Sequence, residues 1–189
     1  MYDVTAPAVY AHESVMAHEK YRERMNRVVR ALRKPVTPVI YSDDRLPDMI
    51  QGGLLKNCVT MGALTEVRDP ILLFNTFRFD SKEDAQQRAK ALQARGFKLQ
   101  DSLLGAGAFN WTYFDLKDDP DRNYKICRRC WRIHLQHGCL HRCKYCNLGG
   151  LLVSMVNVED YCNNLAKIIE RHPWQQKYLL EDDADPVCL

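Results

Sequence analysis

Three cysteines at close spacing constrain this chain more than any other feature of its sequence. The stretch HGCLHRCKYCNLGG, residues 137–150, holds Cys139, Cys143 and Cys146 in the spacing C-x3-C-x2-C. Such a group can be a zinc site, a disulfide knot or the ligand set of an iron–sulfur cluster. The close spacing suits one compact loop, so we expect a loop here between regular elements.

The expected compartment argues against disulfides. The chain has eight cysteines, and five of them lie between positions 127 and 146. We find no apolar run of membrane-spanning length, and the opening MYDVTAPAVYAHESV lacks the basic start and apolar stretch of a signal peptide. We therefore expect a cytoplasmic protein with no membrane partner. Thiols stay reduced there, which favours metal ligation or catalysis.

The residues before position 120 predict an α+β module. Residues 18–34 form a helix that ends at Pro35, with apolar side chains on one face: Met25, Val28, Val29 and Leu32. Strands are expected at 36–42, 71–79, 97–104 and 109–113, and a helix at 81–96. The polar stretch 116–123 predicts a boundary, which gives domains at 1–120 and 121–189.

The second segment predicts the opening of a β/α repeat. Residues 151–156 form a short apolar run after the cysteine loop. Asn157 is expected as the N-cap of a helix that ends near His172, and residues 176–180 are expected as a strand. The fold class expected for the whole chain is α/β. We expect Cys58 and Cys162 to be buried, and His12, His18 and His172 to be ordinary helix residues.

Two sets of ligands have the spacing of a zinc site. A zinc-ribbon nucleic-acid-binding module would use paired C-x2-C hooks, here Cys127, Cys130, Cys143 and Cys146. A smaller local site would combine two thiolates with two imidazoles, from Cys127, Cys130, His134 and His137. Both sets leave Cys139 without a role.

A [4Fe–4S] cluster uses all three cysteines of the loop. Thiolates normally ligate each of the four irons of such a cluster. Cys139, Cys143 and Cys146 would therefore leave one iron without a protein ligand, and that iron can bind a small molecule. Cys127 and Cys130 would then hold an additional zinc ion or simply pack.

The loop resembles the signature of the radical S-adenosylmethionine enzymes, in which an aromatic residue such as Tyr145 precedes the last cysteine. The wider stretch is most similar to the spore photoproduct lyase branch and its DNA-repair relatives. That branch shares a Gly-Cys opening, a Tyr-Cys pair, a following polar residue with Leu, and a helix start of the form VN-acidic-acidic. In this chain these are Gly138-Cys139, Tyr145-Cys146, Asn147-Leu148, and Val156-Asn157 with Glu159-Asp160.

The resemblance implies a fold, a cofactor and a reaction. The fold would be a partial β/α (TIM-like) barrel that follows the N-terminal module. The open iron would bind the amino and carboxylate groups of S-adenosylmethionine, with Tyr145 and Asn147 near this cofactor. An electron from a flavodoxin or ferredoxin would yield a 5′-deoxyadenosyl radical, which in the lyase branch abstracts hydrogen from damaged thymine. For Tyr145 the alternative is packing under the loop.

Two features depart from the family pattern. The sequence stops at Leu189, soon after the loop, whereas a complete eight-fold barrel takes about 250 residues. We therefore expect a fragment that is incomplete as a catalyst. Where the lyases carry a hydrogen-donating cysteine after the second barrel strand, this chain has Glu181 and two aspartates, so no catalytic residue is assigned. Glu181 would meet the amino end of S-adenosylmethionine or form a solvated acidic loop.

The charge around the loop points to a polyanionic partner. Residues 122–158 contain seven basic side chains and no Asp or Glu, with Trp131 and Tyr145 interleaved. The basic residues lie in the stretch 122–144: Arg122, Lys125, Arg128, Arg129, Arg132, Arg142 and Lys144. Clustered cations with aromatic residues are typical of a surface that contacts a phosphate backbone, so DNA is the expected partner. The alternative is a solvated basic face.

Overall fold

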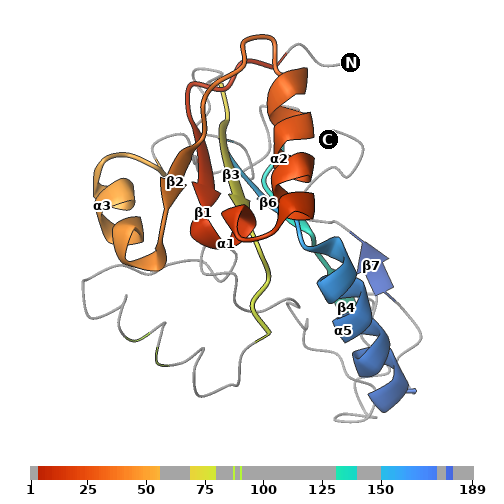
Figure 1. Ribbon diagram of the computed structural model, residues 1–189. Helices are drawn as coiled ribbons and strands as arrows, with labels where there is room; N and C mark the ends of the chain where they lie inside the picture. The colour runs from red at the N-terminus through yellow and green to blue at the C-terminus, as the bar shows by residue number, and fades with distance from the viewer. Residues whose placement is uncertain are drawn as a thin grey trace, which may run out of the picture.

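A computed structural model describes residues 4–55, 69–79, 131–139, 150–173 and 178–180, together with Gln87 and Lys90. Within them, a five-stranded sheet has the order β2-β1-β3-β6-β5 (Figure 1). Its strands are β1 (Val9–His12), β2 (Val39–Tyr41), β3 (Ile71–Asn75), β5 (Gln136–His137) and β6 (Leu151–Met155). Strands β1, β2, β3 and β6 run parallel, and β5 is antiparallel to β6. The chain is therefore α/β, as its sequence predicts.

Strand β3 lies at the centre of the sheet because its side chains are apolar on both faces. All five residues of β3 are buried, as expected for a strand of a parallel sheet that is covered on both sides. Ile71 pairs with Leu151 and Asn75 pairs with Met155, so β3 and β6 match along their full length. The predicted strand 71–79 is confirmed in its first part and ends at Asn75.

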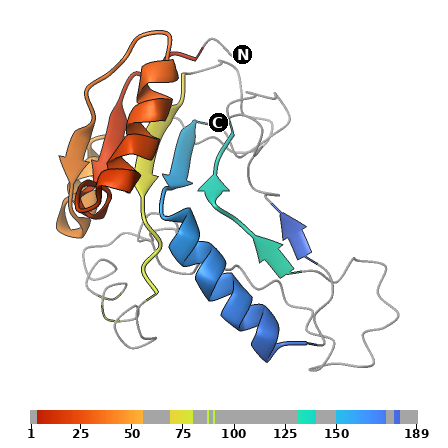
Figure 2. The same ribbon diagram turned by 45° about the vertical axis from the view of Figure 1, so that its right-hand side comes forward.

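Helices cover both faces of the sheet (Figures 1 and 2). Helices α1 (Glu13–Met16) and α2 (Glu19–Ala31) follow β1, and Met25 and Val29 of α2 pack on the face that carries Leu72 and Phe74. Helix α3 (Leu46–Gln51) follows the short 3-10 helix η1 (Asp43–Arg45). Leu46 packs on the opposite face, together with Ile71 and Leu73. The alternation of side chains along β3 thus supplies two separate cores.

A second, smaller sheet contains β4 (Trp131–Ile133) and β7 (Tyr178–Leu180), which run parallel with Ile133 opposite Leu180. Strands β5 and β6 of the larger sheet and helix α5 (Val158–Arg171) lie between β4 and β7 in the chain, so the connection between the two parallel strands passes through the larger sheet (Figure 2). The predicted helix after Asn157 is confirmed, and the predicted strand at 176–180 is confirmed over Tyr178–Leu180, its first two residues being outside the described ranges. The helix at 81–96 falls mostly outside the described residues, and the strands at 97–104 and 109–113 fall entirely outside them.

The five-stranded sheet combines strands from both sides of the predicted boundary. β3 belongs to the predicted domain 1–120 and β6 to the predicted domain 121–189, yet they pair through five residues. The boundary stretch 116–123 itself lies outside the described residues, so the domain division stays a prediction. Among the described strands the arrangement is one open sheet and one parallel pair.

Candidate functional site

Cys139, the first cysteine of the predicted cluster loop, follows β5 after one intervening glycine. Its side chain is half-buried. The remaining predicted ligands and cofactor contacts lie outside the described residues, and they are Cys127, Cys130, Cys143, Cys146, Tyr145, Asn147 and Glu181. The structure therefore places the beginning of the loop, whereas the ligand set stays a prediction.

Gly138 brings the start of the loop against the backbone of β6. Its φ of 93° lies in the left-handed region that L side chains rarely adopt. A Cβ atom at this position would lie 2.1 Å from the carbonyl oxygen of Leu151. Glycine alone satisfies both the backbone conformation and this close approach. Close packing against β6 therefore explains why the residue before Cys139 is a glycine.

The far end of the loop is also tied to the sheet. Gly150 has a φ of 95°, and its carbonyl oxygen accepts a hydrogen bond from the backbone N–H of Ile71 at 2.9 Å. His137 of β5 lies opposite Val153 of β6. These contacts bring the two ends of segment 139–149 together at the amino end of β6. Gly138 and Gly150, on either side of that segment, are therefore both held at the sheet.

Only part of the predicted metal-ligand set lies within the described residues. Within the described ranges, no group of three or more His, Cys, Asp or Glu is arranged to hold a metal ion. His134 and His137 are half-buried near Cys139, and the thiols at 127, 130, 143 and 146 lie outside these ranges. A half-buried cysteine at a closed loop base fits a thiolate ligand. Any cluster or zinc site here would complete its ligand set from the segments on either side.

Asn157 is the N-cap residue of α5, as predicted. Its side chain makes no capping hydrogen bond to the helix backbone, but its Nδ2 donates to Asp160 Oδ2 at 3.2 Å. Its Nδ2 donates to the carbonyl oxygen of Phe77 at 2.9 Å, and its Oδ1 accepts from the backbone N–H of Phe77 at 2.8 Å. The buried amide thus pairs with the peptide groups of Phe77 and extends the contact of β3 with β6 beyond the strand ends.

The acidic pair that follows Asn157 joins α5 to α2. Arg24 Nη1 donates to Glu159 Oε2 at 2.7 Å, and the Tyr21 hydroxyl donates to Asp160 Oδ2 at 2.7 Å. Burial and the Asp160 carboxylate raise the pKa of Tyr21 to about 12. Hydrogen bonds from Arg24 and Lys20 hold the pKa of Glu159 well below its usual range. The motif residues after the loop therefore fix the position of α5 against the N-terminal helix.

A second polar cluster lies at the carboxyl ends of β1, β2 and β3. The sequence predicts a helical His12, but His12 is the last residue of β1 and is 3% exposed. Its Nδ1 lies 2.7 Å from Ser14 Oγ and accepts a hydrogen bond from the Ser14 backbone N–H at 3.1 Å. Ser14 Oγ in turn lies 2.7 Å from Thr76 Oγ1. This chain of hydrogen bonds links the ends of β1 and β3.

Asp43, at the start of η1, is the charged centre of that cluster. Both Nη atoms of Arg78 donate to its carboxylate, with Nη2 2.9 Å from Oδ1. His12 Nε2 lies 3.3 Å from the same oxygen. Burial raises the pKa of Asp43, but the contacts with His12 and Arg78 outweigh it and hold the pKa well below its usual range. Sequence reasoning missed this cluster because its members are far apart in the chain.

Replacing Asp43 with Asn should lower the free energy of unfolding by about 2 kcal/mol at neutral pH, because Arg78 loses its charged partner. The folded-state pKa of Asp43 lies below the unfolded value. Its stabilising contribution is therefore present above the unfolded pKa and is lost as the pH falls through the folded pKa. Urea denaturation at a series of acidic pH values should show a shallower loss of stability in D43N.

Asp48, an exposed carboxylate of α3, provides the matched control for that experiment. D48N should leave both the stability at neutral pH and the slope of the acid limb close to those of the parent chain. An acid limb in D43N as steep as the parent's would contradict the ion pair.

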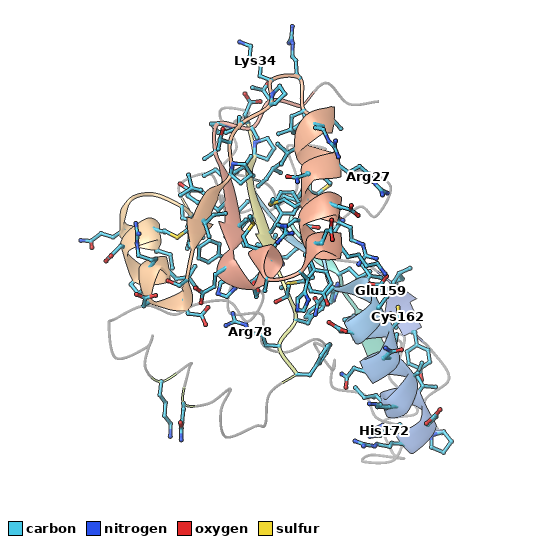
Figure 3. All side chains as sticks on the ribbon, viewed as in Figure 1. Arg27, Lys34, Arg78, Glu159, Cys162 and His172 are labelled. Atoms are coloured by element: carbon cyan, nitrogen blue, oxygen red, sulfur yellow. The ribbon has the colours of Figure 1, made fainter. Side chains whose placement is uncertain are left out.

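Several other predicted residues can be placed. His18 precedes α2 as its N-cap, and His172 follows α5 as its C-cap, with Nδ1 2.7 Å from the Ile168 carbonyl oxygen. Cys162, which the sequence predicts to be buried, is exposed on α5 (Figure 3). It follows the buried Tyr161 and lies on the outer side of the helix. Cys58 and most of the basic stretch 122–144 lie outside the described residues.

The arrangement thus has two candidate sites, the loop that begins at Cys139 and the polar cluster around Asp43. Among the described residues, no helix is both long enough and apolar enough to span a membrane. Comparisons of the chain with family models, with curated proteins and with solved structures found no match.

Proposed function

We propose that this chain is an iron–sulfur protein of the radical S-adenosylmethionine class, similar to spore photoproduct lyase. The observation that carries the proposal is the C-x3-C-x2-C loop, whose first cysteine directly follows Gly138 and whose far end is held at Gly150. A loop with both ends tied to β6 can present several thiolates to one compact cluster. Cys139, Cys143 and Cys146 would be its ligands.

The parallel pairing of β4 with β7 supports the fold that this proposal requires. Ile133 and Leu180 are paired at the carboxyl ends of β4 and β7. The chain reaches Cys139 soon after Ile133, and Glu181 is the next residue after Leu180. Sites in β/α barrels are built from the segments that follow the carboxyl ends of the strands. We therefore take β4, α5 and β7 as the first repeat of a partial β/α barrel, with β5 and β6 of the larger sheet inserted between β4 and α5.

Exposed apolar side chains on β7 and α5 also support a partial β/α barrel. Leu180 is 62% exposed, and Leu179 and Ile169 are each 39% exposed. Parallel sheets are normally covered on both faces, and a two-stranded sheet buries little by itself. Further β/α repeats packed against β7 and α5 would cover these side chains.

The proposed chemistry assigns roles to residues of the loop and its neighbours. Cys139, Cys143 and Cys146 would hold the cluster, and the chemistry it would supply is one-electron cleavage of the sulfonium carbon–sulfur bond of S-adenosylmethionine, which gives methionine and a 5′-deoxyadenosyl radical. Tyr145 and Asn147 would contact the cofactor, and Glu181 would accept a hydrogen bond from its amino group. The stretch 122–144 would contact DNA, a flavodoxin or ferredoxin would deliver the electron, and the protein would act in the cytoplasm. Cys127 and Cys130 would pack or hold a separate zinc ion.

Anaerobic reconstitution with iron and sulfide tests the proposal. The parent chain should bind about four irons and become brown, as a [4Fe–4S] cluster requires. Cys139→Ala should reduce the iron content to less than about one per chain, because the loop loses its first ligand. Cys127→Ala should keep the colour. Iron and sulfide assays with the absorption spectrum measure the result.

Cys162→Ala is the matched control, because Cys162 is an exposed thiol remote from the loop in sequence. It should bind as much iron as the parent chain. One tightly held zinc ion per chain, lost in Cys127→Ala and retained in Cys139→Ala, would overturn the proposal and establish the zinc-ribbon alternative.

A further inference from the structure

The polar cluster around Asp43 lies where α/β sheets commonly bind ligands. β2 lies on one side of β1 and β3 on the other, so the strand order reverses at β1. Ligands of open α/β sheets bind outside the carboxyl ends of the strands at such a switch point. The cluster follows those ends, whereas Gly138 contacts the amino end of β6. The length of β3, about 13 Å from Ile71 to Asn75, separates the two regions.

The hydrogen bonds of His12 determine which of its nitrogens carries the proton. Nδ1 accepts a hydrogen bond from the Ser14 backbone N–H, so the neutral ring is protonated at Nε2. Nε2 lies 3.3 Å from Asp43 Oδ1 but is not aligned as a hydrogen bond, and the Arg78 Nη atoms already donate to both carboxylate oxygens. The buried ring of His12 therefore presents an N–H without a well-formed acceptor.

Two further hydrogen-bond donors beside Asp43, the Tyr41 hydroxyl and the Arg78 Nε, also lack a well-formed acceptor. Tyr41 is 3% exposed, and its hydroxyl has no hydrogen-bond partner among the described residues. Its ring packs edge-on against His12, with 5.2 Å between the ring centroids. The Nε of Arg78 is also buried without a partner in the described part of the chain. Buried polar groups are nearly always hydrogen-bonded, so the two unpaired donors, together with a His12 N–H that is poorly aligned with Asp43, call for an acceptor.

We propose that the His12 Nε2, the Tyr41 hydroxyl and the Arg78 Nε bind a small oxyanion, the phosphate or carboxylate group of a ligand, at the carboxyl edge of β1 and β2. The side chains of Asp43 and Arg78 are 24% and 18% exposed, so solvent reaches the cluster on their side. His12 and Tyr41 form its buried floor. This site is independent of the iron–sulfur function proposed above.

Asp43 and Arg78 neutralise each other, so the ion pair leaves no net negative charge beside the three donors. The ring of His12 is contacted by Ser14, Tyr41 and Asp43, and these are in turn joined to Thr76 and Arg78.

Isothermal titration of the full chain with inorganic phosphate, at constant ionic strength in sodium chloride, tests the site. Tyr41→Phe should weaken phosphate binding by about tenfold or more, because one hydrogen bond to a charged group is lost. Without phosphate, its unfolding midpoint should stay the same or rise, since the variant removes an unpaired buried hydroxyl. The same titration with sodium acetate probes the carboxylate alternative.

Tyr10→Phe is the matched control, because Tyr10 lies on β1 but does not neighbour Asp43. It should leave phosphate binding unchanged. Binding of acetate alone, or of phosphate alone, would identify the carboxylate or the phosphate as the ligand group. A lower midpoint in Tyr41→Phe, with no heat from either anion, would show that an internal water satisfies the donors and would overturn the proposal.

Discussion

Substituting alanine for Gly138 should lower the free energy of unfolding by about 3 kcal/mol and prevent assembly of a cluster at the adjacent loop. The backbone at Gly138 has a φ of 93°, and an added Cβ would lie 2.1 Å from the Leu151 carbonyl oxygen. Because that neighbour is backbone, it cannot rotate away as a side chain would. Removing this clash requires β5 to move away from β6, and Cys139 would move with β5.

Urea denaturation and iron content after anaerobic reconstitution measure the two effects of G138A. Gly52 is the control, since its φ of −70° suits any residue and an added Cβ would approach the Asp48 carbonyl oxygen at 3.2 Å. G52A should change the stability by less than about 1 kcal/mol and leave the iron content unchanged. A G138A chain as stable as the parent would contradict the close approach of β5 to β6.

If G138A lost iron but kept the stability of the parent chain, the effect on the loop would be separate from the effect on the sheet. In that case Gly138 would act on the geometry of the loop rather than on the sheet. Loss of stability with normal iron content would instead show that the loop assembles independently of β6. The pair of measurements therefore distinguishes a structural role of the Gly-Cys opening from a role in metal binding.

The elements that sequence analysis found are those whose own residues specify them. Helices α2 and α5 each carry apolar side chains at helical spacing, such as Met25 with Val29. Strand β3 is a continuous apolar run, which a central parallel strand requires. In these segments the local pattern and the final packing agree, so the periodicity alone was sufficient.

The elements that sequence analysis missed depend on partners that are distant in the chain. β1 and β5 are short, and β5 is a strand because His137 pairs with Val153 of β6. His12 looks like an ordinary polar residue until β2 and β3 bring Asp43 and Thr76 beside it. A chain of hydrogen bonds between residues 62 positions apart leaves no periodic signal in the sequence.

The motif residues after the cysteine loop make structural contacts that the family resemblance does not describe. The resemblance draws on Val156, Asn157, Glu159 and Asp160 as a signature. In the structure Val156 is buried in the core, Asn157 binds the backbone of Phe77, and the two acids bind α2. These residues therefore position the helix that follows the loop, without themselves supplying chemistry to it.

Replacing Asn157 with alanine should lower the free energy of unfolding by about 3 kcal/mol. The change leaves both the N–H and the C=O of Phe77 buried without the side-chain amide that pairs with them, and an unsatisfied buried group costs about 1–3 kcal/mol. Asn163, an exposed asparagine of α5, is the control, and N163A should change the stability by less than about 0.5 kcal/mol. Urea denaturation with fluorescence detection measures both.

Hydrogen exchange extends this test to the place where the effect begins. The backbone N–H of Phe77 should lose its protection in N157A, whereas N–H groups at the centre of β3 should weaken only as the global stability falls. Equal stability of N157A and the parent chain would mean that the amide of Asn157 is not needed to hold residues 76–79 against α5. If iron content then fell while stability held, Asn157 would have to be reassigned from a residue that positions α5 to one that acts on the cluster loop.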